Sequence, residues 1–111
     1  MGVTLRATRS RDWDMGYMRF NKLREDIKDY LWRNRDGIAT VATVHFLNQS
    51  DCDGKLTHKE CKCLLNDIED MPDEGYLYGY IGRGEENCMT LTDFKAMLQS
   101  CYSHRCNLIW F

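Results

Sequence analysis

The sequence is poor in proline, since Pro72 is the only proline among 111 residues. Proline removes a backbone donor and clashes with the preceding helical turn, so its scarcity favours a helical chain. The sequence also lacks any apolar run near the roughly 18 consecutive residues that a membrane-spanning helix needs. We therefore expect a single helical domain without a transmembrane segment.

Recognisable catalytic combinations are missing as well. His45, His58 and His104 have no carboxylate or nucleophile beside them in a catalytic arrangement, and no glycine-rich phosphate-binding loop is present. We expect the protein not to be an enzyme. The chain carries 15 Lys and Arg against 17 Asp and Glu, and this acidic balance argues against a nucleic-acid partner.

Residues 51–60, which read DCDGKLTHKE, have a regular spacing. Two aspartates alternate before Gly54, the apolar Leu56 follows, and Glu60 lies six residues after the glycine. This spacing resembles the EF-hand calcium loop, D-x-[DN]-x-[DN]-G-x5-E, whose alternate residues point toward the ion. The resemblance implies a positive φ at Gly54, a short strand around Leu56 that pairs with a partner loop, and a glutamate that completes the ligand shell.

The same resemblance implies one Ca2+ site, because Ca2+ takes about six to eight oxygen ligands from such a loop. The implied ligands are Gln49, Asp51, Asp53, Lys55 through its carbonyl, Thr57 and Glu60. Gln49 stands where the family usually has an aspartate, so the site has one negative charge fewer. Starting the loop at Asn48 is the alternative, which makes the loop one residue longer and keeps most of these ligands near the ion.

Residues 82–93 repeat the spacing of the first loop, and Asp93 takes the position of Glu60. Gly82 and Gly84 stand at two ligand positions, where they offer no side-chain oxygen. We interpret this second copy as a degenerate EF-hand that pairs with the first but does not bind calcium.

The complete pattern predicts an all-α fold, a paired EF-hand unit with one additional N-terminal amphipathic helix. The expected parts are a flexible tail at 1–12, the N-terminal helix at 13–35, the first EF-hand at 38–70, the degenerate second EF-hand at 72–103 and an apolar C-terminal tail at 104–111. In the first hand, Val41, Val44 and Leu47 are expected to face the core. Thr57 and Glu60 predict a capping box at the start of the exiting helix.

The N-terminal helix is expected to be basic. Residues 1–35 carry nine Lys and Arg against five Asp and Glu, whereas residues 36–111 carry six against twelve. A basic amphipathic helix can bind a partner protein or a membrane surface. The favoured interpretation is that it packs on the acidic EF-hand pair of its own chain, because an open apolar groove would be a liability.

Six cysteines, an even number, are many for a reducing compartment; they stand at positions 52, 61, 63, 88, 101 and 106. They favour a secreted protein with up to three disulfides. The hypotheses for pairing are Cys52 with Cys88, and Cys61 and Cys63 with Cys101 and Cys106. Zinc is the competing interpretation, with ligands from Cys61, Cys63, Cys101, His104 and Cys106, although their spacing is not that of common structural zinc sites.

These observations predict a secreted, non-enzymatic EF-hand-like protein, in which one Ca2+ and the disulfides stabilise a surface that binds another protein. The alternative is a calcium-independent, disulfide-held secreted ligand, such as a toxin, a pheromone or a gamete- or cell-recognition protein. In that case Trp110, Phe111 and the aromatic residues of the first helix would form the contact surface. A third hypothesis is a cytosolic calcium or zinc sensor, which free thiols would support.

Overall fold

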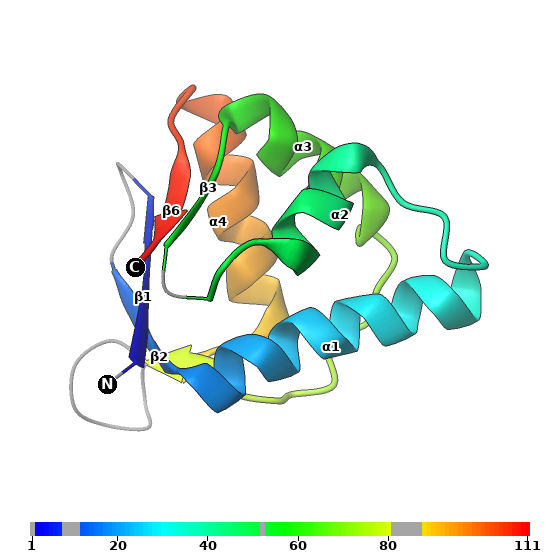
Figure 1. Cartoon of the computed structure of the whole chain (residues 1–111), viewed down its shortest axis with the longest axis horizontal. Helices are drawn as coiled ribbons and strands as arrows, with labels where there is room; N and C mark the ends of the chain where they lie inside the picture. The colour runs from blue at the N-terminus through cyan, green and yellow to red at the C-terminus, as the bar shows by residue number, and fades with distance from the viewer. Residues whose placement is uncertain (1, 8–11, 52, 81–87) are drawn as a thin grey trace.

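The computed structural model describes residues 2–7, 12–51, 53–80 and 88–111. Within these residues it is a mixed α/β structure of helices and one antiparallel sheet (Figure 1). The helices are α1 (Tyr17–Asn34), α2 (Val41–Asn48), α3 (His58–Asp67) and α4 (Leu91–Ser103). The strands are β1 (Gly2–Ala7), β2 (Trp13–Gly16), β3 (Gly54–Leu56), β4 (Gly79–Tyr80), β5 (Cys88–Met89) and β6 (Leu108–Trp110), in the sheet order β3-β6-β1-β2-β4-β5.

The prediction of an all-α fold is wrong, because both expected tails contain strands. The stretch 1–12 contains β1, and the stretch 104–111 contains β6. In β1, Val3, Leu5 and Ala7 are buried, so the apolar residues recur every second position and not with helical spacing. β1 pairs with β2 on one side and with β6 on the other. The first and last strands of the chain therefore lie side by side inside the sheet.

The two predicted EF-hand loops do not pair with each other, so the paired arrangement is also wrong. β3, in the first loop, pairs with β6, and Leu56 lies opposite Leu108. β5, in the second copy, pairs with β4, which places β3 and β5 at opposite edges of the sheet. Residues 72–78, at the start of the expected second EF-hand, are not helical. The ligand positions Gly82 and Gly84 lie outside the described residues.

The N-terminal helix begins at Tyr17 and not at Trp13, because residues 13–16 form β2. Its buried side, which includes Phe20 and Ile27, packs against the rest of the chain. None of the described helices combines the length and the apolar character needed to cross a membrane.

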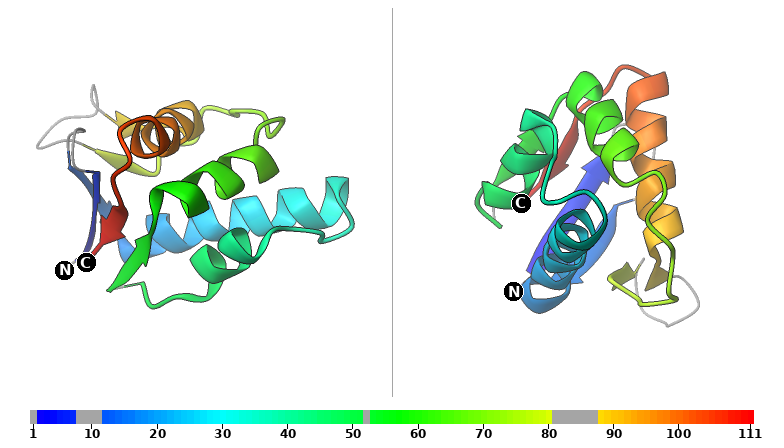
Figure 2. Two further views of the ribbon diagram at one scale, coloured as in Figure 1. Left: turned by 90° about the horizontal axis from the view of Figure 1, so that it is seen from above. Right: turned by 90° about the vertical axis from the view of Figure 1, so that its right-hand side faces the viewer.

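Four buried aromatic residues join the layers of the fold. The helices lie together on one side of the sheet (Figure 2). Phe20 of α1, Phe46 of α2, Phe94 of α4 and Trp110 of β6 form a chain of ring contacts with centroids 5.4–6.0 Å apart. Trp110 is 1% exposed, so its expected place on a contact surface is wrong. The C-terminal strand is part of the core.

Candidate functional site

The first predicted loop has the backbone order of helix, loop, short strand and helix. It lies between α2 and α3 and contains β3. The hydroxyl of Thr57 accepts from the N–H of Glu60 at 3.3 Å, and Oε1 of Glu60 accepts from the N–H of Thr57 at 3.0 Å. This reciprocal pair is the predicted capping box, which is confirmed.

Gly54 is required for a different reason from the one that the sequence suggests. Of the described glycines, Gly37 and Gly75 have a positive φ, and Gly54 does not. Gly54 lies opposite Trp110 in the sheet, and a Cβ added to it would meet the Cε2 atom of Trp110 at 2.0 Å. The indole Nε1 also donates to the carbonyl of Ser50 at 2.8 Å. Gly54 therefore provides the space for a core tryptophan that holds the loop.

Two of the predicted calcium ligands bond to each other. Nε2 of Gln49 donates to the carbonyl of Lys55 at 2.9 Å, and Oε1 of Gln49 accepts from the N–H of Lys55 at 3.0 Å. This amide therefore closes the loop with the hydrogen bonds that a neighbouring strand would otherwise supply.

The three predicted acidic ligands lie in different surroundings. Oδ2 of Asp51 accepts from Nδ2 of Asn21 on α1 at 3.4 Å, and Asp53 is exposed. Oε2 of Glu60 lies 3.1 Å from Nδ1 of His45, so Glu60 joins the start of α3 to α2. Burial would raise the pKa of Glu60, but the hydrogen bonds from Thr57 and His45 outweigh it and the pKa is lowered.

The guanidinium group of an α1 arginine contacts this loop. Arg24 of α1 is buried, and its Nη2 donates to the carbonyl of Gln49. Its guanidinium carbon lies 5.0 Å from the ring centroid of Phe20 and 5.9 Å from that of Phe46. Burial lowers the pKa of Arg24, whereas the charge of Asp51 raises it. Arg24 and Trp110 thus bind two consecutive carbonyls of the loop, and sequence reasoning missed this role of Arg24.

The donor set does not fit a Ca2+ ion in this arrangement. Ca2+ needs about six to eight oxygens converging at about 2.3–2.6 Å, whereas Gln49, Lys55 and Glu60 are engaged with protein groups. The described residues contain no group of three or more His, Cys, Asp or Glu that could hold a metal ion, zinc included. Calcium binding through this loop stays a prediction from the sequence.

We expect the fold to be independent of calcium. Calorimetric titration with CaCl2 up to about 1 mM should give no binding heat, and chelator should leave the melting temperature unchanged, because Arg24, Trp110 and Gln49 hold the loop. Glu60→Gln is the control variant. Binding heat in the natural sequence that disappears in Glu60→Gln would show that the carboxylates rearrange around the ion, as the EF-hand resemblance implies.

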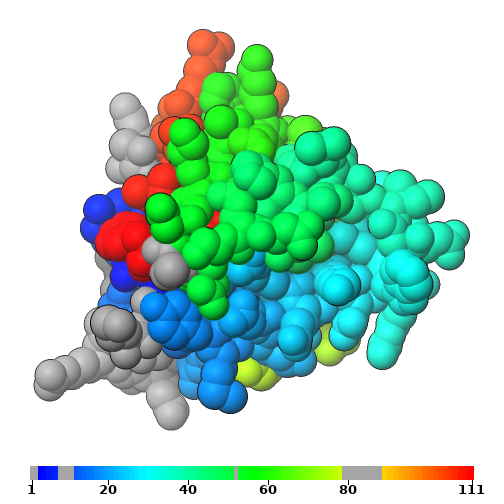
Figure 3. Space-filling view, viewed as in Figure 1, coloured from blue at the N-terminus to red at the C-terminus, as the bar shows by residue number. Residues whose placement is uncertain are grey.

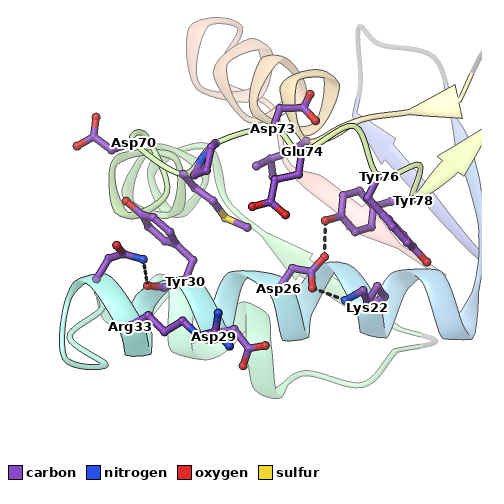
Figure 4. A pocket seen from close by; sticks show the side chains of 14 residues that line it. Lys22, Asp26, Asp29, Tyr30, Arg33, Asp70, Asp73, Glu74, Tyr76 and Tyr78 are labelled. Atoms are coloured by element: carbon purple, nitrogen blue, oxygen red, sulfur yellow. Dashed lines mark hydrogen bonds and ion pairs between the residues drawn. The ribbon is translucent and has the colours of Figure 1, made fainter.

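A cleft of about 610 Å3 lies between α1 and residues 70–78 (Figure 4). At its centre, Asp26 accepts from Nζ of Lys22 at 2.7 Å and from the hydroxyl of Tyr78 at 2.5 Å. Burial and the neighbouring Asp26 raise the pKa of Tyr78. The carboxylate of Glu74 points into the cleft, whereas that of Asp70 points away. Lys22 and Asp26 show helical i,i+4 spacing, but nothing in the sequence connects either to Tyr78.

An apolar surface lies on the other side of α1, where α1 meets α2. Trp32 is 72% exposed, Ile38 67%, Val41 85% and Val44 47%. We call these four residues the apolar surface. The prediction that Val41 and Val44 face the core is wrong. Phe46 and the other buried residues of α2 face the core instead.

A groove of about 590 Å3 opens beside the apolar surface, between α1 and α2. Its apolar lining includes Leu31, Trp32, Ala39, Val44 and Leu47. This face of the molecule, formed by the C-terminal half of α1, the following loop and α2, is turned toward the viewer in Figure 3. Solvent-exposed apolar residues beside a groove are the usual features of a protein-binding surface.

The cysteines whose side chains the structure describes are free thiols. Cys61 and Cys101 are buried, and Cys63 and Cys106 are partly exposed. The hypothetical Cys52–Cys88 pair lies outside the described residues, because Cys52 and the side chain of Cys88 are not described.

Comparisons with known proteins assign no family to the chain. No protein-family model matches it, and neither the curated proteins nor the solved structures contain a significant match.

Proposed function

We propose that this chain is a non-enzymatic binding module that holds another protein through the apolar surface. The observation that carries the proposal is the exposure of Trp32, Ile38, Val41 and Val44, of which Trp32 and Val44 line the groove. A soluble chain usually buries large apolar side chains, and a group of them left in solvent marks an interaction site. Aromatic residues such as Trp32 are also enriched in the centres of protein interfaces.

The groove supports an amphipathic helix as the partner element. A helix that binds in a groove inserts apolar anchors at positions i, i+3 or i+4, and i+7. The groove encloses about 590 Å3, and Leu31, Ala39 and Leu47 give it the apolar lining that such anchors require. The charged residues of the groove lining are Arg24, Glu25 and Lys28, so its net charge is small and does not favour a strongly charged partner.

The local architecture keeps this surface open. α1 ends where the N–H of Gly37 donates to the carbonyl of Leu31 at 2.9 Å, and Gly37 has a φ of 74°. A Cβ on Gly37 would lie 2.7 Å from Cε3 of Trp32, so the glycine lets the turn fold under the indole ring. Gly37 thus lies close to the Trp32 ring, while most of the Trp32 side chain faces solvent.

Val41→Glu is expected to weaken helix binding by about tenfold or more, because a charge would replace an apolar anchor. The measurement is a titration of 15N-labelled protein with a neutral, amphipathic helical peptide, followed by NMR chemical shifts. We expect shifts in residues of the apolar surface and the groove. Met18→Glu is the matched control, because Met18 is 87% exposed on α1 and belongs neither to the apolar surface nor to the groove lining.

Two outcomes would contradict the proposal. Peptide-induced shifts confined to other faces, or equal affinity in Val41→Glu and the natural sequence, would remove the apolar surface from the binding site. A concentration-dependent dimer that Val41→Glu abolishes would identify a second copy of the chain as the occupant and overturn the proposed partner.

A further inference from the structure

Three cysteines that are distant in sequence meet between α3, α4 and the segment after α4. Cys61 on α3 and Cys101 on α4 are both fully buried in the same core cluster. Cys61 and Cys106 both influence the pKa of the Cys101 thiol, which places them close to it. The N–H of Cys106 also donates to the carbonyl of Cys101 at 3.0 Å, which holds Cys106 beside the end of α4. Cys101 is therefore the middle member of the cluster.

The three thiols differ in their access to solvent. Cys106 is partly exposed, whereas Cys61 and Cys101 are not. The hydrogen bond to Cys61, together with burial, raises the pKa of Cys101, so this thiol is a poor nucleophile toward reagents in solution. Oxidation of the buried pair therefore requires an exposed partner.

We propose that Cys61, Cys101 and Cys106 form a thiol–disulfide relay, in which Cys106 reacts with a small-molecule disulfide and the oxidation ends in a Cys61–Cys101 bridge. Cys106 attacks oxidised glutathione, forms a mixed disulfide and releases one glutathione thiolate. Cys101 then attacks the sulfur of Cys106, which releases the second glutathione thiolate. Cys61 attacks Cys101 and returns Cys106 to the thiol. The two protons lost by Cys61 and Cys101 pass to the two glutathione thiolates, so one disulfide is reduced as one is formed.

The final position of the bridge follows from burial and chain connectivity. A Cys101–Cys106 bridge would close a very short loop and leave one sulfur partly exposed to reductant. A Cys61–Cys101 bridge closes a loop of about 40 residues and constrains the unfolded chain more strongly. Cys63 is excluded by geometry, because residues two positions apart on a helix do not share a face.

The relay can be tested by quenched peptide mapping. Reduced protein is placed in glutathione redox buffer, alkylated at intervals, digested with trypsin and analysed by mass spectrometry. The cleavage sites after Lys55, Lys62, Arg83, Lys95 and Arg105, with the flanking sites, place each of the six cysteines in a different peptide. We expect peptide 60–62 to be linked to peptide 96–105. Formation of this bridge should raise the melting temperature by about 10–20 °C.

Two variants separate the relay from a simple disulfide. Cys106→Ser should slow bridge formation by about tenfold or more without changing its equilibrium yield, because it removes the exposed entry point. Cys63→Ser, the matched control, should change neither. An unchanged rate in Cys106→Ser would overturn the relay. So would a Cys101–Cys106 end product, a bridge to Cys63, or glutathionylation of Cys106 without any bridge.

Discussion

Replacing Gly54 with alanine should destabilise the protein by about 3 kcal/mol, a large part of the stability of a small domain. The added Cβ would lie 2.0 Å from Cε2, 2.1 Å from Cζ2 and 2.3 Å from Nε1 of Trp110. The indole has no room to move, because it contacts Phe20 and Phe46 and bonds to the Ser50 carbonyl. Urea denaturation of the variant would measure the loss.

The same substitution in a Trp110→Phe protein distinguishes a steric clash with the indole from an effect on the backbone. Phenylalanine lacks the indole Nε1, so Gly54→Ala should cost less in a Trp110→Phe protein than in the natural sequence. An equal cost in both backgrounds would show that the explanation is wrong. Gly16→Ala is the control, because a Cβ there meets nothing within 4 Å, and its cost should stay below about 1 kcal/mol.

Replacing Asp67 with alanine should cost about 2–4 kcal/mol, because it breaks a buried set of charge-assisted hydrogen bonds. The carboxylate accepts from the hydroxyl of Thr43 at 2.6 Å and from the N–H and hydroxyl of Thr40 at 2.8 Å each. Nη1 of Arg35 lies 3.1 Å away. Asp67 thereby fixes the start of α2 to the end of α3, and its loss would leave buried donors unpaired.

Asp67 also makes the stability of the protein depend on pH. Burial would raise the pKa of Asp67, but hydrogen bonds from Thr43 and Thr40 and the charge of Arg35 outweigh it, so the pKa lies below its ordinary value of 3.8. A lowered folded-state pKa adds stability that is complete above the unfolded-state pKa and is lost as the pH falls through the folded-state pKa.

The free energy of unfolding should therefore fall more steeply below about pH 4 in the natural protein than in Asp67→Asn. Urea denaturation across this pH range measures the difference. Glu69→Gln is the control, since Glu69 is exposed on the same segment. Parallel pH profiles for the natural protein and Asp67→Asn would contradict the assigned role.

Structural features that depend on neighbouring residues could be predicted from the sequence. The spacing of Thr57 and Glu60 predicts the capping box at α3, and the apolar spacing of α1 predicts its buried side. The EF-hand resemblance implies a short strand at Leu56, which is present as β3, although its partner is β6 and not a second loop. The capping-box partners lie three residues apart, and the apolar side of a helix follows from its own repeat, so local backbone geometry alone makes these features recognisable.

Contacts between distant segments could not be predicted in the same way. Arg24 bonds to the loop 25 residues later, and Tyr78 bonds to Asp26 52 residues earlier. No periodicity connects such pairs. The second copy at 82–93 predicts paired loops, whereas the actual partner of β3 is a strand at the C-terminus.

By itself, the sequence determined the local elements of this protein: the amphipathic α1, the capped start of α3, and the absence of a membrane-spanning helix among the described residues. The tertiary structure alone decided that β1 and β6 pair inside a sheet and that Trp110 fills the space at Gly54. Short strands become stable when a neighbour satisfies their backbone hydrogen bonds. In this chain those neighbours come from opposite ends of the sequence.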